Sequence, residues 1–181
     1  DVFGYLSGGA LALELLAWTD DSTRATAVTI QDGRYCKSGD KTRLLLGTFY
    51  TASTTTTEDS LRRRLVGNMY NQVPRRMYRV SGQASHSYAS SSYRVWNNDS
   101  ANSFDVCVPS PVAASVSANC TVNNSSGWLA AGGGEVSGQQ STTQTSLGTA
   151  AGVVQCAAGR TNIPANERSF ATTTFEYLQM N

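Results

Sequence analysis

The sequence predicts a mostly β protein: a jelly-roll-like antiparallel β-sandwich in a single domain over residues 1–181, with one amphipathic α-helix inserted at about residues 57–73. Three observations predict it. Charged residues make up only 15% of the chain and small polar residues take their place, which suits strands joined by short turns. Short runs of alternating apolar and polar residues recur between turn signals. One segment instead has a four-residue apolar period.

The N-terminal strands are predicted from alternation. Residues 2–6 and 10–18 flank a Ser-Gly-Gly connection, and in the second run leucines at every other position alternate with Ala and Glu. Asp32-Gly33 predicts a second tight hairpin, between residues 25–31 and 34–36. Residues 42–51 follow as a strand apolar enough to be buried on both faces.

The inserted helix is predicted from a period of four. Leu61, Leu65, Met69 and Val73 recur at that spacing, which would place them on one helix face. Upstream, Thr55 and Glu58 have the spacing of a capping box and Asp59 suits the positive end of a helix, and Pro74 would end it.

Further strands are expected after the helix, each bounded by turn residues. They are residues 75–82, 87–96, 104–109, 113–122, 147–156 and 169–179. Many short strands at such intervals are typical of a sandwich or jelly roll.

Nothing in the sequence predicts a catalytic or metal site. His86 is the only histidine, and it lies in a Ser-rich stretch that predicts an exposed turn. The acidic residues show no spacing that selects a catalytic pair, and Asp20, Asp21 and Asp32 fit turns better than a calcium site. We therefore expect no enzyme activity, no cofactor and no bound metal.

Four cysteines lie far apart in the sequence, without a CxxC pair: Cys36, Cys107, Cys120 and Cys156. A domain of this length does not need disulfides for stability, so free, buried thiols are favoured. The alternative is a bridge, for which Cys107–Cys120 is the most plausible pairing.

A cluster of arginines forms the main charged feature. Its members are Arg62, Arg63, Arg64, Arg75 and Arg76. Arginine suits fixed, bidentate contacts, so these residues are candidates for a contact with a neighbouring subunit; the alternative is a solvated helix face. A net charge of +1 argues against a nucleic-acid partner, and no apolar run reaches the roughly 20 residues that a membrane-spanning helix needs.

Aromatic residues among Ser, Asn and Arg form a candidate glycan-binding set. They are Tyr88, Tyr93, Trp96 and Trp128. The alternative, which is favoured, is that these rings are half-buried aromatics of a β-sheet.

The order of several motifs over residues 1–96 resembles a segment that recurs in structural proteins of tailed bacteriophages. The motifs are DVFGY (1–5), LALELLAWTDDSTRAT (11–26), IQDG (30–33), KSGDKTR (37–43), LGTFYT (46–51), TEDSLRRR (57–64) and NMYNQVPRRM (68–77), with FEYLQ (175–179) near the end. The resemblance implies a virion component on the particle surface, commonly a homotrimer, that contacts other virion proteins. It brings no catalytic motif.

Three functional hypotheses follow. The first is a fibre, spike or capsid-surface domain that serves assembly and attachment to the host, with a host-surface glycan as a further partner. The second is a capsid decoration (cement) protein without receptor binding, and the third is a carbohydrate-binding module. Because Asp1 already lies in strand-like sequence, the chain is expected to be a fragment or C-terminal domain of a longer virion protein.

Overall fold

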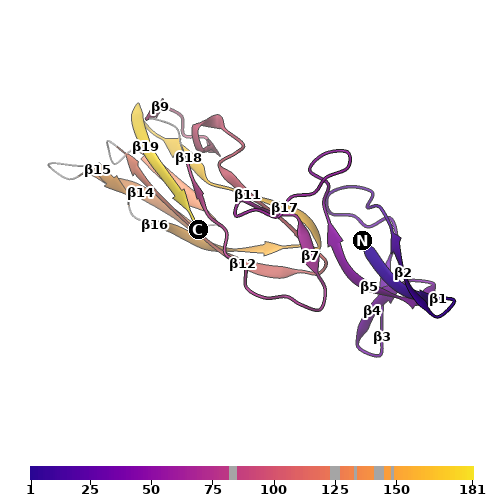
Figure 1. Ribbon diagram of the computed structural model, residues 1–181. Helices are drawn as coiled ribbons and strands as arrows, with labels where there is room; N and C mark the ends of the chain where they lie inside the picture. Colours follow the sequence, from indigo (N-terminus) through magenta and orange to yellow (C-terminus); the bar gives the residue numbers. More distant parts are fainter. Residues whose placement is uncertain (82–84, 123–126, 133, 141–144, 148) are drawn as a thin grey trace.

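The computed structural model describes residues 1–181 except 82–84, 123–126, 133, 141–144 and 148. The predicted mostly β class is confirmed: nearly all regular structure consists of strands, in several mainly antiparallel sheets. Figure 1 shows two regions, an N-terminal sheet and a larger group of sheets formed by the rest of the chain. In the described part of the chain, the one helical element is the 3₁₀ turn η1, Trp96–Asn98.

The first region, here called the N-terminal sheet, has the strand order β2-β1-β5-β4-β3, with β7 added beside β5. Its strands are β1 (Val2–Ser7), β2 (Ala10–Leu15), β3 (Val28–Gln31), β4 (Arg34–Lys37), β5 (Asp40–Phe49) and β7 (Val66–Asn68). Both predicted hairpins are present. In the β3–β4 turn, Asp32 and Gly33 both have positive φ (49° and 74°), the conformation that favours Asp-Gly in a two-residue hairpin turn.

The second region, here called the C-terminal sandwich, contains three sheets. Their orders are β17-β11-β6, β16-β12-β19-β8 with β9 beside β19, and β10-β18-β13-β14-β15. The strands are β6 (Arg63–Arg64), β8 (Arg79–Val80), β9 (His86–Tyr88), β10 (Arg94–Val95), β11 (Ser103–Val108), β12 (Val112–Val122), β13 (Gly127–Ala131), β14 (Gly134–Gln140), β15 (Thr145–Leu147), β16 (Thr149–Cys156), β17 (Gly159–Pro164), β18 (Asn166–Ser169) and β19 (Thr173–Met180).

One hydrophobic core fills the C-terminal sandwich. It combines Trp96 with side chains from β11, β12, β13, β16, β17 and β19, among them Phe104, Leu129, Phe175 and Leu178. The described residues of the N-terminal sheet contribute nothing to this cluster; their buried apolar side chains are Phe3, Leu45 and Cys36. The two regions therefore bury separate sets of side chains.

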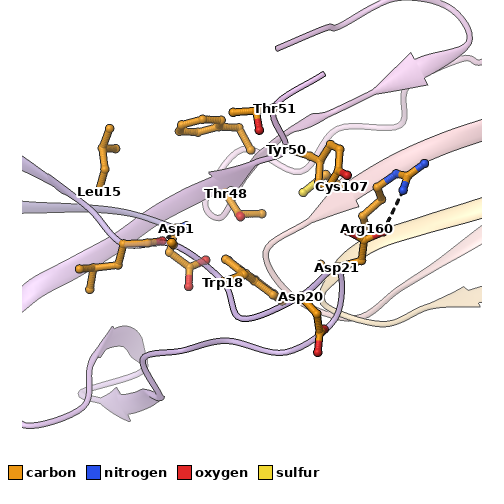
Figure 2. Close-up of a pocket in the computed structure, with 14 residues that line it drawn as sticks. Asp1, Leu15, Trp18, Asp20, Asp21, Thr48, Tyr50, Thr51, Cys107 and Arg160 are labelled. Carbon is orange, nitrogen blue, oxygen red and sulfur yellow. Dashed lines mark hydrogen bonds and ion pairs between the residues drawn. The ribbon is translucent and has the colours of Figure 1, made fainter. Parts of the chain in front are cut away.

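The loop over residues 18–24, between β2 and β3, contacts the C-terminal sandwich. Arg160 donates its backbone N–H to the Asp21 carbonyl (2.6 Å) and pairs through its guanidinium with the Asp21 carboxylate (2.8 Å; Figure 2). Gly159 has φ of +103°, and a Cβ there would lie 2.3 Å from the Asp21 carbonyl oxygen. Arg24 donates to the Pro109 carbonyl at 2.7 Å. The close approach of the two regions thus depends on a glycine and on two arginines.

The predicted helix at about 57–73 is wrong. In its place the chain forms β6 and β7, and the backbone bonds go to distant strands: Met69 donates to the Leu46 carbonyl (2.9 Å), and Tyr50 donates to that of Leu65 (2.9 Å). The carboxylate of Glu58, predicted to cap the N-terminus of the helix, instead pairs with Arg63 (3.0 Å). Of the four periodic residues only Leu65 is fully buried. Pairing with strands far away in the sequence therefore overrides the local helical pattern.

Candidate contact surface

One face of the N-terminal sheet carries solvent-exposed leucines. On β2, Leu11, Leu13 and Leu15 lie on the same side of the sheet, because side chains alternate along a strand. The register pairs Leu11 with Leu6 of β1, which places Leu6 on that side as well. Leu6, Leu11, Leu13 and Leu15 are 75, 74, 59 and 63% exposed. We call this surface the leucine face.

The leucine face continues across β5. Gly4, opposite Leu13, also pairs with Leu44, and the space above it is filled by Leu46, whose Cδ1 lies 3.0 Å from where a Cβ would be. Leu44 and Leu46 are half-buried. A run of leucines therefore extends over three adjacent strands.

The opposite face of the same sheet carries buried and charged side chains on β1, β2 and β5. Phe3 and Leu45 face each other across β1 and β5 and are fully buried. Beside them Glu14 pairs with Lys37 (3.0 Å) and Arg43 (3.3 Å). Soluble monomers rarely expose a contiguous apolar patch without a partner, so the leucine face is the strongest candidate for a contact with another molecule.

The structure pairs most of the candidate arginines within the chain. Arg63 bonds Glu58 and the buried Asp105 (3.2 Å), and Arg64 and Arg75 share Asp59 at 3.3 and 2.5 Å. Arg62 donates to the Ala101 carbonyl, at 3.4 Å. Arg76 is exposed, over the ring of Tyr78. These five residues are not gathered on one helix face, and their role as a subunit contact stays a prediction.

The candidate glycan residues fall into different environments. Trp96 is buried in the core, so it is not available to a ligand in this structure. Tyr88 is half-buried, donates its hydroxyl to the Ser92 carbonyl (2.8 Å) and lies under Arg94. Of the four candidates, Tyr93 and Trp128 have rings that contact the same arginine side chain.

That shared cation is Arg168. Its guanidinium lies 4.6 Å from the ring of Tyr93, 4.9 Å from that of Trp128 and 5.2 Å from that of Phe170. Phe170, which the sequence did not single out, is exposed. Three rings around one guanidinium form a surface patch that could hold a sugar ring; we call it the aromatic patch.

A buried ionic cluster lies beneath the sandwich surface, where the sequence predicted an exposed histidine. That prediction is wrong: the side chain of His86 is only 11% exposed, stacked on Phe175 and edge-on to Trp96. Its Nε2 lies 2.6 Å from Glu167, which is fully buried and also accepts from Arg94 Nε (2.7 Å). No local pattern could have revealed it, because Glu167 lies 73 positions from Arg94 and 81 positions from His86 in the sequence.

A hollow of about 510 Å³ lies at the joint of the two regions (Figure 2). The acidic side chains in its lining already have structural roles. Asp21 pairs with Arg160. The Asp20 carboxylate accepts from the backbone N–H groups of Ser22 and Thr23, and the Ser22 N–H, foremost among these bonds, lowers the pKa of Asp20. Its acidic groups therefore hold turns and the joint.

The predicted free, buried thiols are confirmed at all four cysteines. Burial raises the pKa of Cys107, and burial together with the negative charge of Glu167 raises the pKa of Cys120 well above its ordinary value. Neither thiol is therefore primed for reaction at neutral pH.

The described residues contain neither a metal-binding cluster nor a helix suited to cross a membrane. No group of three His, Cys, Asp or Glu side chains there could hold a metal ion. Within the same residues, no helix has the length and apolar character to cross a membrane.

Comparison of the chain with protein-family models, with curated proteins and with solved structures finds no match. The surfaces described above are therefore the basis on which a function can be assigned.

Proposed function

We propose that this chain is a non-enzymatic structural domain of a bacteriophage particle, located at the particle surface, that works as a homotrimer with the leucine face as its subunit contact. The observation that carries the proposal is the exposure of Leu6, Leu11, Leu13 and Leu15 on one sheet face. The phage-like order of motifs over residues 1–96 supports it, because that stretch contains the whole N-terminal sheet.

The energy of covering this face is large enough to matter. Full burial of one leucine contributes about 1.5–3 kcal/mol, and each of the four is exposed by more than half. Covering them together would contribute several kcal/mol, to be set against the entropy cost of association. Fibre and spike proteins gain stability in this way, because assembly adds buried area that the isolated chain lacks.

The fold suits such a role. The sheets of the C-terminal sandwich enclose one core, and we propose that they form a jelly-roll-like arrangement within a single domain that presents its loops outward. The same leucine face would serve a fibre or spike domain in host attachment, or a cement protein on a capsid shell.

The mass of the purified protein in solution tests the proposal. Light scattering is expected to give about three times the 19.3 kDa of one chain. A Leu11→Asp, Leu13→Asp double variant is expected to be monomeric, because it places two charges on the leucine face. Ile30→Asp is the matched control: Ile30 is 62% exposed on the same sheet, but its pairing with Tyr35 places it on the opposite face.

The outcome separates the alternatives. A monomeric wild-type protein over a wide concentration range would overturn the homotrimer. If Ile30→Asp lowers the mass as much as the double variant does, the contact does not use the leucine face.

The aromatic patch favours a second candidate function, glycan binding. An exposed Phe170 and Trp128, which both contact the Arg168 guanidinium, offer ring faces on which a sugar ring can stack. Phe170→Ala is expected to weaken binding of bacterial surface polysaccharide without changing the mass. Binding that is unchanged in Phe170→Ala would remove this candidate.

A further inference from the structure

The aromatic patch lies on the outer face of one sheet of the C-terminal sandwich, where β18 runs between β10 and β13. Trp128 of β13 is paired with Arg168 of β18. Tyr93 directly precedes β10, and its ring lies 4.6 Å from the Arg168 guanidinium. Phe170 follows Arg168 by two residues and lies beside the same guanidinium. Three separate segments of the chain therefore bring rings around one cation.

The charges of β18 are divided between the two faces of the sheet. Glu167 points into the core, where Arg94 and His86 contact its carboxylate. Its neighbour Arg168 points outward, because side chains alternate along a strand. A guanidinium has five N–H donors, so Arg168 can bind a further acceptor in addition to its contacts within the chain. The outer face therefore presents a cation among aromatic rings, while the adjacent acidic side chain faces the core.

A serine-rich loop borders the aromatic patch. Ser169 donates its backbone N–H to the Ser90 carbonyl at 2.8 Å, which holds the loop over residues 90–93 beside the end of β18. Ser91 and Ser92 in this loop are exposed. A serine hydroxyl both donates and accepts hydrogen bonds, as the hydroxyl groups of a sugar do. The surroundings of the patch therefore suit a hydroxyl-rich ligand.

We propose that the ligand of the aromatic patch is an acidic polysaccharide, built from sugars whose pyranose ring carries a carboxylate. The apolar face of the sugar ring would pack on Trp128 and Phe170. The carboxylate would bind the Arg168 guanidinium in the planar geometry that arginine favours. The inference rests on glycan binding, the second candidate function above, and adds the chemical class of the sugar. It does not involve the leucine face.

The test uses the full chain and two acidic oligosaccharides, trigalacturonate and trimannuronate, each compared with its own methyl ester. The ester keeps the sugar ring and removes the charge of the carboxylate. Calorimetry is expected to show binding of at least one acid, with its ester bound about tenfold more weakly, because hydrogen bonds to charged groups are the stronger ones. Added salt is expected to weaken binding of the acid more than binding of the ester.

Three variants locate the site. Arg168→Gln is expected to bind the acid and the ester equally, and Arg168→Lys to keep a reduced preference, because lysine keeps the charge without the planar fork. Arg43→Gln is the matched control. Arg43 also lies over an aromatic ring, that of Tyr5 (3.9 Å), but in the N-terminal sheet, where it pairs with acidic side chains. This variant is expected to retain the full preference for the acid.

The results distinguish failure of this inference from failure of glycan binding itself. Equal binding of acid and ester by the unmodified protein would overturn the inference and leave the second candidate function intact. A preference that Arg168→Gln retains, or that Arg43→Gln loses, would also overturn it, because the carboxylate would then be bound elsewhere. Absence of binding of both acids and both esters at millimolar concentration would overturn the inference together with glycan binding.

Discussion

The two regions of this molecule differ in how completely one chain buries their apolar side chains. The C-terminal sandwich encloses a continuous core and even surrounds a fully buried glutamate with charged and polar partners. The N-terminal sheet covers Phe3 and Leu45 on one face and leaves four leucines exposed on the other. The sandwich encloses one core within the described residues, whereas the N-terminal sheet has a face that suits a second molecule.

This difference shows where to look for stability and where to look for function. Changes in the sandwich should alter the free energy of unfolding. Changes on the leucine face should alter association and leave the single chain folded.

The largest expected effect is at the buried Glu167. Glu167→Gln removes the charge that Arg94 and His86 contact, and leaves the Arg94 cation partly buried without a counter-charge. We expect the free energy of unfolding to fall by about 3–5 kcal/mol, measured by denaturant titration.

Glu14→Gln in the N-terminal sheet is the matched control. Glu14 pairs with Lys37 and Arg43, but its side chain is partly open to solvent. Its loss should cost less than about 1 kcal/mol. Equal losses in the two variants would mean that the sandwich does not depend on its buried charge.

A smaller effect is expected where the two regions meet. Gly159→Ala would place a Cβ against the Asp21 carbonyl in a backbone conformation that favours glycine. We expect a loss of about 1–3 kcal/mol and faster proteolysis of the loop over residues 18–24. Gly39→Ala, with similar φ but open space around it, measures the strain alone. If Gly39→Ala has the same effect on both measurements, the close approach at the joint contributes nothing.

The smallest effect is a pH dependence in the segment that connects the two regions. The Ser60 hydroxyl (2.6 Å) and the nearby Arg63 charge lower the pKa of Glu58. A carboxyl with a lowered pKa in the folded state adds stability above its unfolded pKa of about 4.3, and that stability is lost as the pH falls through the folded value. Glu58→Gln should therefore flatten the decline in stability at acidic pH. An unchanged decline would contradict this assignment.

The parts of the structure that the sequence predicted are those with local causes. The hairpins around Gly8-Gly9 and Asp32-Gly33 depend on turn residues, and the alternation of Leu11, Leu13 and Leu15 follows from strand geometry. The segment from 57 to 73 was predicted as a helix because its apolar period is local, whereas its hydrogen bonds go to β5 and β11.

The candidate sites show the same division. The arginines were predicted as one surface because they are adjacent in sequence, but Arg63 reaches Asp105 and Arg64 reaches Asp59. The aromatic patch needed Arg168 and Phe170 brought beside Tyr93 and Trp128 by tertiary structure. The alternation of leucines in residues 10–15 is evident in the sequence. Which face of the sheet is covered, however, depends on how the rest of the chain folds.

Thiol labelling tests most directly whether the leucine face is covered in the assembled protein. All four native cysteines are buried, so a Leu13→Cys variant and an Ile30→Cys variant each add one thiol that can react over a low background. A subunit contact through the leucine face predicts slow maleimide labelling of Leu13→Cys, which accelerates on dilution, and fast labelling of Ile30→Cys at every concentration. Equally fast labelling of both variants at high concentration would contradict the account.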